Sequence, residues 1–338
     1  MKYRLLDHIV CDICKGYFRV EVKEAVEVDY ARIPEFATCA NCSFGDTFNC
    51  TDCIRYEIKS GRLLCSCGRA YPIVDFTPVL LNSNTVSDTQ THFDAQWRFW
   101  GGDAKIYGKT KDEMLNWCFS HLIPSHVSRD YFKERLILDA GCGHGKFSVA
   151  FAELDNEVIG MDITSHVRKV YVDHVGIFPL LHFIQADVLH PPLKQERFDY
   201  VFSEGVIHHT GDTRRAFKEL LSLVKPRGMF GIWVYPHRSR LFEIYARAIR
   251  TITSRLPKNF LYVLSYIPVP LLSVIKAYSR TSLKNASWRQ CAQVVFDFFG
   301  PQFQSHHTEA EIKKWFFEEG IERVEFAKVD PVSVSAVK

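Results

Sequence analysis

The chain has 338 residues, of which 47% are hydrophobic and 24% are charged, and its formal net charge at pH 7 is +3. This length is typical of two domains, and this balance is typical of a globular protein with a large core. A net charge near zero gives no support to nucleic-acid binding by the molecule as a whole.

The chain shows no sign of a targeting or membrane-spanning segment. Residues 1–15 lack the apolar run of a secretory signal, and Pro268 and Pro270 interrupt the apolar stretch over residues 260–275. We therefore expect a cytoplasmic protein, and we leave peripheral contact with a membrane open.

Eight of the eleven cysteines lie before residue 70 and form four close pairs. Three pairs are CxxC and the last is CxC: Cys11/Cys14, Cys39/Cys42, Cys50/Cys53 and Cys65/Cys67. A CxxC turn brings two thiolates to one ion, and tetrahedral zinc takes four ligands, so four pairs predict two structural zinc ions. We expect the two inner pairs to share one ion and the two outer pairs to share the other. Reduced cysteines without metal, and iron–sulfur ligation, are the alternatives.

The last cysteine pair precedes Tyr71-Pro72-Ile73 and an apolar strand. This context resembles the small zinc-ribbon proteins that act as partner subunits of tRNA and release-factor methyltransferases. The sequence departs from their pattern in its CxC knuckle, in its inner cysteine pairs, and in Phe76, where a glycine usually follows the aspartate. The resemblance implies a small β module over residues 1–81. Its zinc should be structural, because eight thiolates leave no open coordination position.

Beyond residue 130, short apolar runs alternate with helical patterns, which predicts a parallel sheet with crossover helices. The first run ends at Asp139 and opens into Gly141-Cys142-Gly143-His144-Gly145 ahead of an apolar helix. Glycines in such a turn let backbone N–H groups approach a nucleotide closely. The turn alone does not distinguish one nucleotide cofactor from another.

Two acidic residues end the next two predicted strands. Asp162 ends the second strand, where a carboxylate can accept hydrogen bonds from both ribose hydroxyls. Asp187, followed by Val188, ends the third strand, where a carboxylate can accept a hydrogen bond from an adenine amino group. The order of these features indicates an adenosyl cofactor.

This series resembles the class I S-adenosylmethionine (SAM)-dependent methyltransferases over residues 130–235 and 305–338. The resemblance implies a seven-stranded sheet with a reversed last strand, and methyl transfer from SAM. A dinucleotide-binding fold usually spaces its third glycine one residue further and lacks the terminal hairpin. The resemblance also implies which residues contact SAM: Asp139, Gly141, Cys142, Gly143, Asp162, Asp187, Val188 and Glu204.

The loop after the fourth strand should face the transferred methyl group. Its His208 and His209 are candidate general bases, because imidazole titrates near neutral pH. Alternatively, one histidine fixes the loop and the other is solvated, since alignment of the attack supplies much of the rate. A metal bound by the histidine pairs is a further alternative. Other residues are expected to contact the acceptor: Trp97, Tyr235, His237, His306 and His307.

Residues 236–300 form an unusual insertion ahead of the last helix. From Arg238 to Arg289 the chain has ten Lys or Arg residues and one acid, Glu243, interleaved with apolar and aromatic residues. A helical lid over the substrate is one interpretation. A membrane-surface element over residues 238–289 and an RNA-binding face are the others.

The sequence therefore predicts an α/β protein with a zinc-ribbon-like module at residues 1–81, a linker with helices at 82–129 and a Rossmann-like methyltransferase domain at 130–338. The expected acceptor is an O or N atom of a small or carrier-linked metabolite, such as a sugar, a polysaccharide precursor or a secondary metabolite. Two alternatives remain: an RNA or protein methyltransferase that binds its macromolecule through the ribbon, and a non-catalytic binding protein of the same fold. Nucleic acid is the less favoured partner, and no oligomeric state is predicted.

Overall fold

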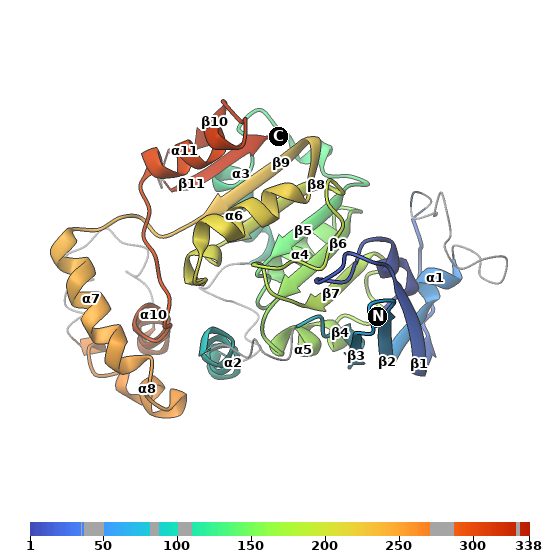
Figure 1. Ribbon diagram of the computed structural model, residues 1–338, viewed down its shortest axis with the longest axis horizontal. Helices are drawn as coiled ribbons and strands as arrows, with labels where there is room; N and C mark the ends of the chain where they lie inside the picture. Colours follow the sequence, from blue (N-terminus) through green and yellow to red (C-terminus); the bar gives the residue numbers. More distant parts are fainter. Residues whose placement is uncertain (35, 37–50, 82–87, 101–109, 271–286, 329–331) are drawn as a thin grey trace.

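The computed structural model describes residues 1–34, 36, 51–81, 88–100, 110–270, 287–328 and 332–338. It contains two sheets. A four-stranded sheet runs in the order β1-β2-β3-β4, and a seven-stranded sheet runs in the order β10-β11-β9-β8-β5-β6-β7. Figure 1 shows the small sheet at one side of the large one.

The small sheet belongs to the N-terminal module and is antiparallel throughout. Its elements are the 3-10 helix η1 (Tyr3–Asp7), β1 (Phe18–Glu27), α1 (Asp52–Arg55), β2 (Tyr56–Cys65), β3 (Ala70–Val74) and β4 (Thr77–Pro78). The turn between β3 and β4 puts Phe76 at a φ of +65°. Glycine adopts this left-handed conformation most easily, so Phe76 occupies a conformation that is uncommon for a residue with a bulky side chain.

The large sheet has five parallel strands and a reversed strand, as predicted. The parallel strands are β5 (Leu136–Ala140), β6 (Glu157–Asp162), β7 (Leu181–Gln185), β8 (Phe198–Glu204) and β9 (Val224–Trp233). The last strand, β11 (Ser333–Val337), runs antiparallel to both β9 and β10 (Val324–Phe326). The fold prediction is therefore confirmed, including the terminal hairpin.

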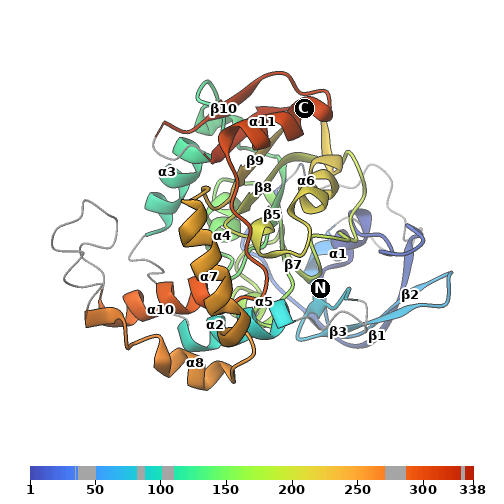
Figure 2. The ribbon, with the colours of Figure 1, turned by 60° about the vertical axis from the view of Figure 1, so that its left-hand side comes forward.

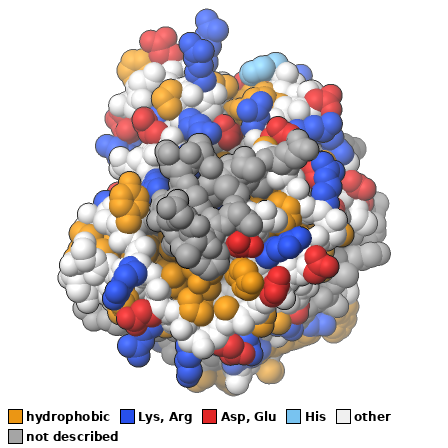
Figure 3. All heavy atoms as spheres, turned by 90° about the vertical axis from the view of Figure 1, so that its right-hand side faces the viewer, with side chains coloured by type: hydrophobic (Ala, Val, Ile, Leu, Met, Phe, Trp, Pro, Cys, Tyr) orange, Lys and Arg blue, Asp and Glu red, His pale blue; other side chains and the backbone are white. Residues whose placement is uncertain are grey.

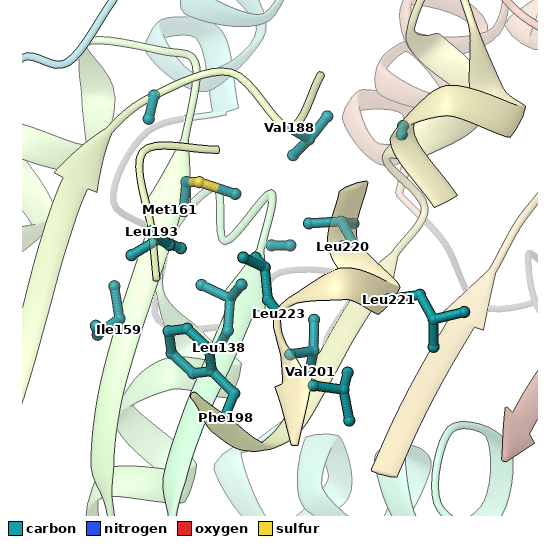
Figure 4. Packing of buried hydrophobic residues seen from close by; sticks show 14 of the residues in the cluster. Leu138, Ile159, Met161, Val188, Leu193, Phe198, Val201, Leu220, Leu221 and Leu223 are labelled. Atoms are coloured by element: carbon teal, nitrogen blue, oxygen red, sulfur yellow. The ribbon is translucent and has the colours of Figure 1, made fainter. Parts of the chain in front are cut away.

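Helices cover both faces of the large sheet, so its central strands are buried on both sides and read as continuous apolar runs. These helices are α3 (Lys111–His121), α4 (Lys146–Ala152), α5 (His166–Val172), α6 (Thr213–Ser222) and α11 (Glu309–Glu318), and short 3-10 turns lie at η5 (Arg129–Tyr131) and η6 (Ile207–His209). Figure 4 shows Leu138 and Val201 of the sheet packed close to Leu220 and Leu223. The same core cluster includes Leu5 of the N-terminal module. The two domains therefore share one core.

The N-terminal module docks on the large sheet through buried charges. Glu157, at the start of β6, accepts hydrogen bonds from Arg4 Nε (2.9 Å) and Nη2 (2.8 Å). His8 Nε2 lies 2.8 Å and His182 Nε2 lies 3.3 Å from Glu157 Oε1. Burial alone would raise the pKa of Glu157, but His8, His182 and Arg4 hold it well below its usual value. The carboxylate thus stays ionised between the two domains.

The module also extends the edge of the large sheet. Leu80 N donates a hydrogen bond to Gln185 O (2.8 Å), and Val79 forms a parallel bridge with Gln185 at the end of β7. Gln185 lies two residues before Asp187. The module therefore supports the third strand tip directly and covers part of an otherwise open strand edge.

A separate helical group lies on the other side of the large sheet (Figures 1 and 2). It consists of α2 (Asp88–Trp100), α7 (Arg240–Thr253), α8 (Lys258–Leu264) and α10 (Trp288–Phe299). Helix α10 contacts each of the other three, and α2 also contacts α8. The predicted insertion is therefore helical where it is described. Among the described helices, none combines the length and apolar character needed to cross a membrane.

Candidate active site

A cavity of about 930 Å³ lies at the carboxyl ends of the parallel strands. This volume is within the usual range of small-molecule sites, and the position is the usual one for ligands of open α/β sheets. All of the residues predicted to contact the cofactor line this cavity: Asp139, Gly141, Cys142, Gly143, Asp162, Asp187, Val188 and Glu204. The structure therefore brings the predicted cofactor residues together.

The glycine loop after β5 has no room for a side chain at its first two glycines. Gly141 has a φ of +88°, and a Cβ atom there would lie 2.2 Å from Val206. Gly143 has a φ of +50°, and a Cβ atom there would lie 2.4 Å from the ring of Trp97. Both positions require glycine for conformation and for space.

Asp162 holds this loop in place from the tip of β6. Its Oδ2 accepts a hydrogen bond from Gly143 N (2.8 Å), and its Oδ1 accepts two from Thr164, from N at 2.8 Å and Oγ1 at 2.7 Å. An ionised carboxylate offers about four acceptor sites, so at least one remains for a ligand hydroxyl. Asp162 can thus order the loop and contact a ribose.

The carboxylates of Asp139, Asp162 and Glu204 give one side of the cavity a negative charge. Burial raises the pKa of Asp139 to about 7; Ser148 Oγ, donating at 2.6 Å, lowers it, and the charges of Asp162 and Glu204 raise it further. Burial also raises the pKa of Asp162. Carboxylates that raise one another's pKa are stabilised by a nearby cation, so the site favours a positively charged ligand.

The third strand tip forms the other end of this group. Asp187 Oδ1 accepts a hydrogen bond from Leu189 N (2.9 Å), and Val188 beside it is buried. Both residues line the cavity. This arrangement places a carboxylate and an apolar side chain where the resemblance expects the adenine.

Helix α2 closes the cavity over the glycine loop. The ring of Trp97 lies 4.3 Å from that of His144, centroid to centroid, and directly against Gly143. Asp94 fixes the helix because its Oδ1 accepts hydrogen bonds from Ser165 N (2.7 Å) and Oγ (2.8 Å) at the start of α5. We predicted that Trp97 contacts the acceptor. The structure places Trp97 in the cavity lining, over the glycine loop, and its contact with an acceptor stays a prediction.

The cavity wall formed by α2 and α10 carries a polar cluster, of which the sequence analysis identified only Tyr235. Tyr235 Oη donates a hydrogen bond to Asp297 Oδ2 (2.6 Å), and Gln96 Nε2 donates to Asp297 Oδ1 (3.0 Å). All three residues line the cavity, as do Phe93 and Phe303. Asp297 was overlooked because the insertion was treated as a lid. Its signal was an acid within an aromatic run, Phe296-Asp297-Phe298-Phe299.

His209 also lines the cavity, but its free nitrogen is covered. Its Nδ1 lies 3.2 Å from Phe303 O, so Nδ1 carries the proton and Nε2 has the lone pair. Nε2 is buried without a hydrogen-bond partner in the described part of the chain, and Phe93 packs on the ring edge-to-face at 5.1 Å. Burial lowers the pKa of His209, which favours the neutral form.

The other predicted histidines do not reach the cavity lining. His208 is fully buried, with its ring 4.0 Å from that of Tyr235. His306 Nδ1 pairs with Glu243 (2.8 Å), and His307 contacts Ser305 Oγ (2.8 Å). His237 donates its backbone N–H to His307 O. The rings of His208 and His306 both pack against the ring of Tyr235. Within the described residues, these histidines belong to no group of three side chains that could bind a metal ion together.

The outer cysteine pairs form a compact cluster in the N-terminal module. The sulfur atoms of Cys11, Cys14, Cys65 and Cys67 all lie within 4.8 Å of one another. Four thiolates around one zinc ion at about 2.3 Å are roughly 3.8 Å apart, so this cluster fits a tetrahedral zinc site. The predicted pairing of the outer knuckles is thus observed. Of the predicted inner site, Cys53 is buried, and Cys39, Cys42 and Cys50 lie outside the described residues.

Fold and site together define a Rossmann-like domain of the class I methyltransferase type, joined to a cysteine-rich zinc-ribbon-like module. Comparison with known families agrees with both parts. Residues 138–232 match the methyltransferase domain family, and residues 2–75 match the Trm112p-like protein family. The two matched segments are the ones in which the sequence analysis predicted these resemblances.

Individual relatives cover only part of the chain. The malonyl-[acyl-carrier protein] O-methyltransferase of Salmonella typhimurium is 32% identical over 93 residues, which are 28% of this chain and 36% of that protein. The probable tRNA methyltransferase 9B of Homo sapiens is 31% identical over 121 residues, 32% of this chain and 23% of that protein. The magnesium protoporphyrin IX methyltransferase of Synechocystis, solved with bound SAH, has a TM-score of 0.42 and 17% identity, covering 76% of this chain and 100% of that one. The chain thus spans well under half the length of these two curated relatives.

Proposed function

We propose that this chain transfers the methyl group of SAM to an O or N atom of an acceptor that binds against α2 and α10. The observation that carries the proposal is a single cavity. It holds all of the predicted cofactor residues and, on another wall, the Asp297–Tyr235–Gln96 cluster.

The cofactor side of the cavity accounts for binding. SAM supplies a methyl group on a positively charged sulfur, and Asp139, Asp162 and Glu204 favour that charge. Asp162 and the glycine loop hold the ribose and the amino-acid part, and Asp187 accepts a hydrogen bond from the adenine. Helix α2 covers the loop, which excludes water from the reacting group.

The side of the cavity that carries Asp297 would orient the acceptor. Asp297 is fixed by Tyr235 and Gln96, and a carboxylate still has sites for a hydroxyl or amine hydrogen of the acceptor. Such a bond would aim the acceptor's lone pair at the methyl group. The methyl–acceptor bond would form as the methyl–sulfur bond of SAM breaks, with S-adenosylhomocysteine as the leaving group and the acceptor's proton passing to Asp297. Alignment supplies most of the rate in such a transfer. His209 serves this step only if Phe93 moves away from it.

The aromatic lining favours a compact acceptor with an apolar face. Phe93 and Phe303 line the same cavity as Asp297, and the ring of Trp233 lies 5.3 Å from that of Tyr235. Rings of this kind pack on planar groups or on the C–H face of a sugar, while the carboxylate binds a hydroxyl. This supports a small or carrier-linked metabolite as the substrate class.

A second candidate is methylation of RNA or protein, with the N-terminal module binding the macromolecule. It is supported by the match of residues 2–75 to the Trm112p-like family and by the similarity to a probable tRNA methyltransferase. In the described part of the face that carries this module, Lys and Arg side chains alternate with Asp and Glu (Figure 3). A face of mixed charge gives phosphate binding little support.

The test uses SAM labelled on its methyl group and cell extract separated into small-molecule, lipid and RNA fractions. The proposal expects label in a small-molecule or lipid fraction, and at least about a tenfold loss with Asp297→Asn. The exposed Glu309→Gln serves as the matched control. Label in RNA alone supports the second candidate, and no transfer to any fraction contradicts both.

The metal content belongs to the same proposal. We expect two structural zinc ions, one bound by the observed outer cluster and one by Cys39, Cys42, Cys50 and Cys53. Elemental analysis of the purified chain should give two zinc ions per molecule, and one with Cys65→Ser. A single zinc ion in the unmodified chain would contradict the inner site.

A further inference from the structure

The outer side of α7 carries an apolar stripe that no described element covers. Leu241 is 81% exposed, Ile244 and Tyr245 are each 59% exposed, and Ile252 is 67% exposed. With the exposed Ala248, these positions fall on one side of the helix, because an α-helix turns once about every 3.6 residues. The opposite side of α7 already packs inward, through Ala246 and Arg250. The helix therefore exposes an apolar face in addition to the side that the fold buries.

Helix α8 and the turn after it repeat the pattern. Phe260, Val263 and Ile267 are spaced by three and four residues and are 53%, 65% and 71% exposed. Their neighbour Leu261 is buried against α2 and α10. Scattered exposed apolar residues need no explanation, but two consecutive helices that each expose an apolar stripe indicate an interaction surface.

Cations border this surface, and its one acid is turned inward. Arg240 and Arg247 lie along one edge of the α7 stripe and Arg255 follows the helix, and all three are exposed. None of the three forms an ion pair within the described residues. Glu243, the single acid between Arg238 and Arg289, pairs with His306 (2.8 Å) and accepts a hydrogen bond from Arg238 N. The surface therefore combines long apolar side chains with uncompensated positive charge.

This combination selects one kind of partner. RNA would neutralise the arginines but leave Leu241, Ile244 and Ile252 in water, because aliphatic side chains offer no stacking face. A second copy of the chain would place like charges opposite each other. An anionic bilayer accepts both features, since apolar side chains enter the acyl boundary while arginines bind the phosphate groups.

We infer that the outer face of α7 and α8 docks on an anionic membrane surface, with both helices lying in the plane of the interface. Helix α10 packs directly under these helices and presents Asp297 to the cavity. The docked molecule therefore holds its acceptor side one helix layer from the lipid. The inference rests on the exposed surface and not on the proposed methyl transfer, so either can fail alone.

The test is co-sedimentation of the full chain with vesicles of phosphatidylcholine, with or without phosphatidylglycerol. We expect binding to the mixed vesicles, and at least about tenfold weaker binding to phosphatidylcholine alone. Ile244→Gln/Ile252→Gln should reduce binding to the mixed vesicles at least about tenfold, and Arg240→Gln/Arg247→Gln should remove most of its salt dependence. Ile177→Gln, at a side chain 58% exposed on another face, should bind like the unmodified chain.

Because the changed side chains are exposed, all variants should keep the unmodified melting temperature. The inference is overturned by three results: no binding of the unmodified chain to mixed vesicles, equal binding by Ile244→Gln/Ile252→Gln, or equal loss with Ile177→Gln. Sedimentation velocity without vesicles can give a fourth contradicting result. If the Ile244→Gln/Ile252→Gln variant dissociates a dimer, the surface is a self-association site.

Discussion

The buried carboxyl of Asp139 predicts that cofactor affinity depends on pH. Its pKa is raised to about 7, first by burial and further by the charges of Asp162 and Glu204. The ionised form attracts the cation of SAM, and the protonated form does not. Between about pH 8 and about pH 6 the ionised fraction of a group with a pKa of about 7 falls about tenfold, so SAM affinity should fall about tenfold over the same interval.

Isothermal titration calorimetry at several pH values measures this directly. Asp139→Asn removes the titrating group, so its SAM affinity should be lower at about pH 8 and nearly independent of pH. If SAM itself titrates in this interval, Asp139→Asn shows the same effect, so the difference in pH dependence between the two chains reports on Asp139. An unchanged affinity of the original chain from about pH 6 to about pH 8 would refute the reasoning, as would an identical pH dependence in Asp139→Asn.

Three further predictions concern the domain boundary, the glycine loop and the zinc site. Glu157→Ala removes the buried carboxylate that accepts two hydrogen bonds from the Arg4 guanidinium, so it should lower the free energy of unfolding in urea by about 3–5 kcal/mol. Gly143→Ala puts a Cβ atom 2.4 Å from Trp97, so calorimetry should show at least about a tenfold loss of SAM affinity. Removing zinc with a chelator should unfold the N-terminal module, and SAM affinity should fall with it, because Leu80 supports the third strand tip.

Each of these predictions has a matched control. Glu153→Ala changes an exposed acid near the start of β6 and should alter stability by less than about 0.5 kcal/mol. Gly211→Ala, where the nearest atom to a new Cβ lies 3.9 Å away, should bind SAM normally. If either control matches its test variant, the assigned contact is not the cause. A chelated chain with an unchanged melting profile contradicts the zinc site.

The cofactor half of the site was predictable because it follows from chain order. Strand ends of a parallel sheet meet at one edge, so Asp139, Asp162 and Asp187 had to converge once their strands were recognised. The outer cysteine cluster was predictable for a similar reason, since paired spacing is itself a local signal.

Most of the proposed acceptor side, apart from Tyr235, was not predictable, because it is assembled by tertiary packing. Asp297 reaches the cavity only because α10 packs on α2, and Trp97 reaches the glycine loop only because Asp94 fixes α2 to α5. The adjacent residues His306 and His307 were predicted to contact the acceptor. In the structure the His306 side chain pairs with Glu243, and the His307 side chain hydrogen-bonds to Ser305. Sequence spacing identified residues with suitable chemistry, but the direction of their side chains depends on tertiary packing.

The most direct test of the account is a crystal structure of the chain with S-adenosylhomocysteine. The account predicts the ribose hydroxyls on Asp162, the adenine beside Asp187 and Val188, and the sulfur facing the wall that carries Asp297. A ligand-filled cavity in which these carboxylates point elsewhere, or a ligand bound outside this cavity, would contradict the central claim.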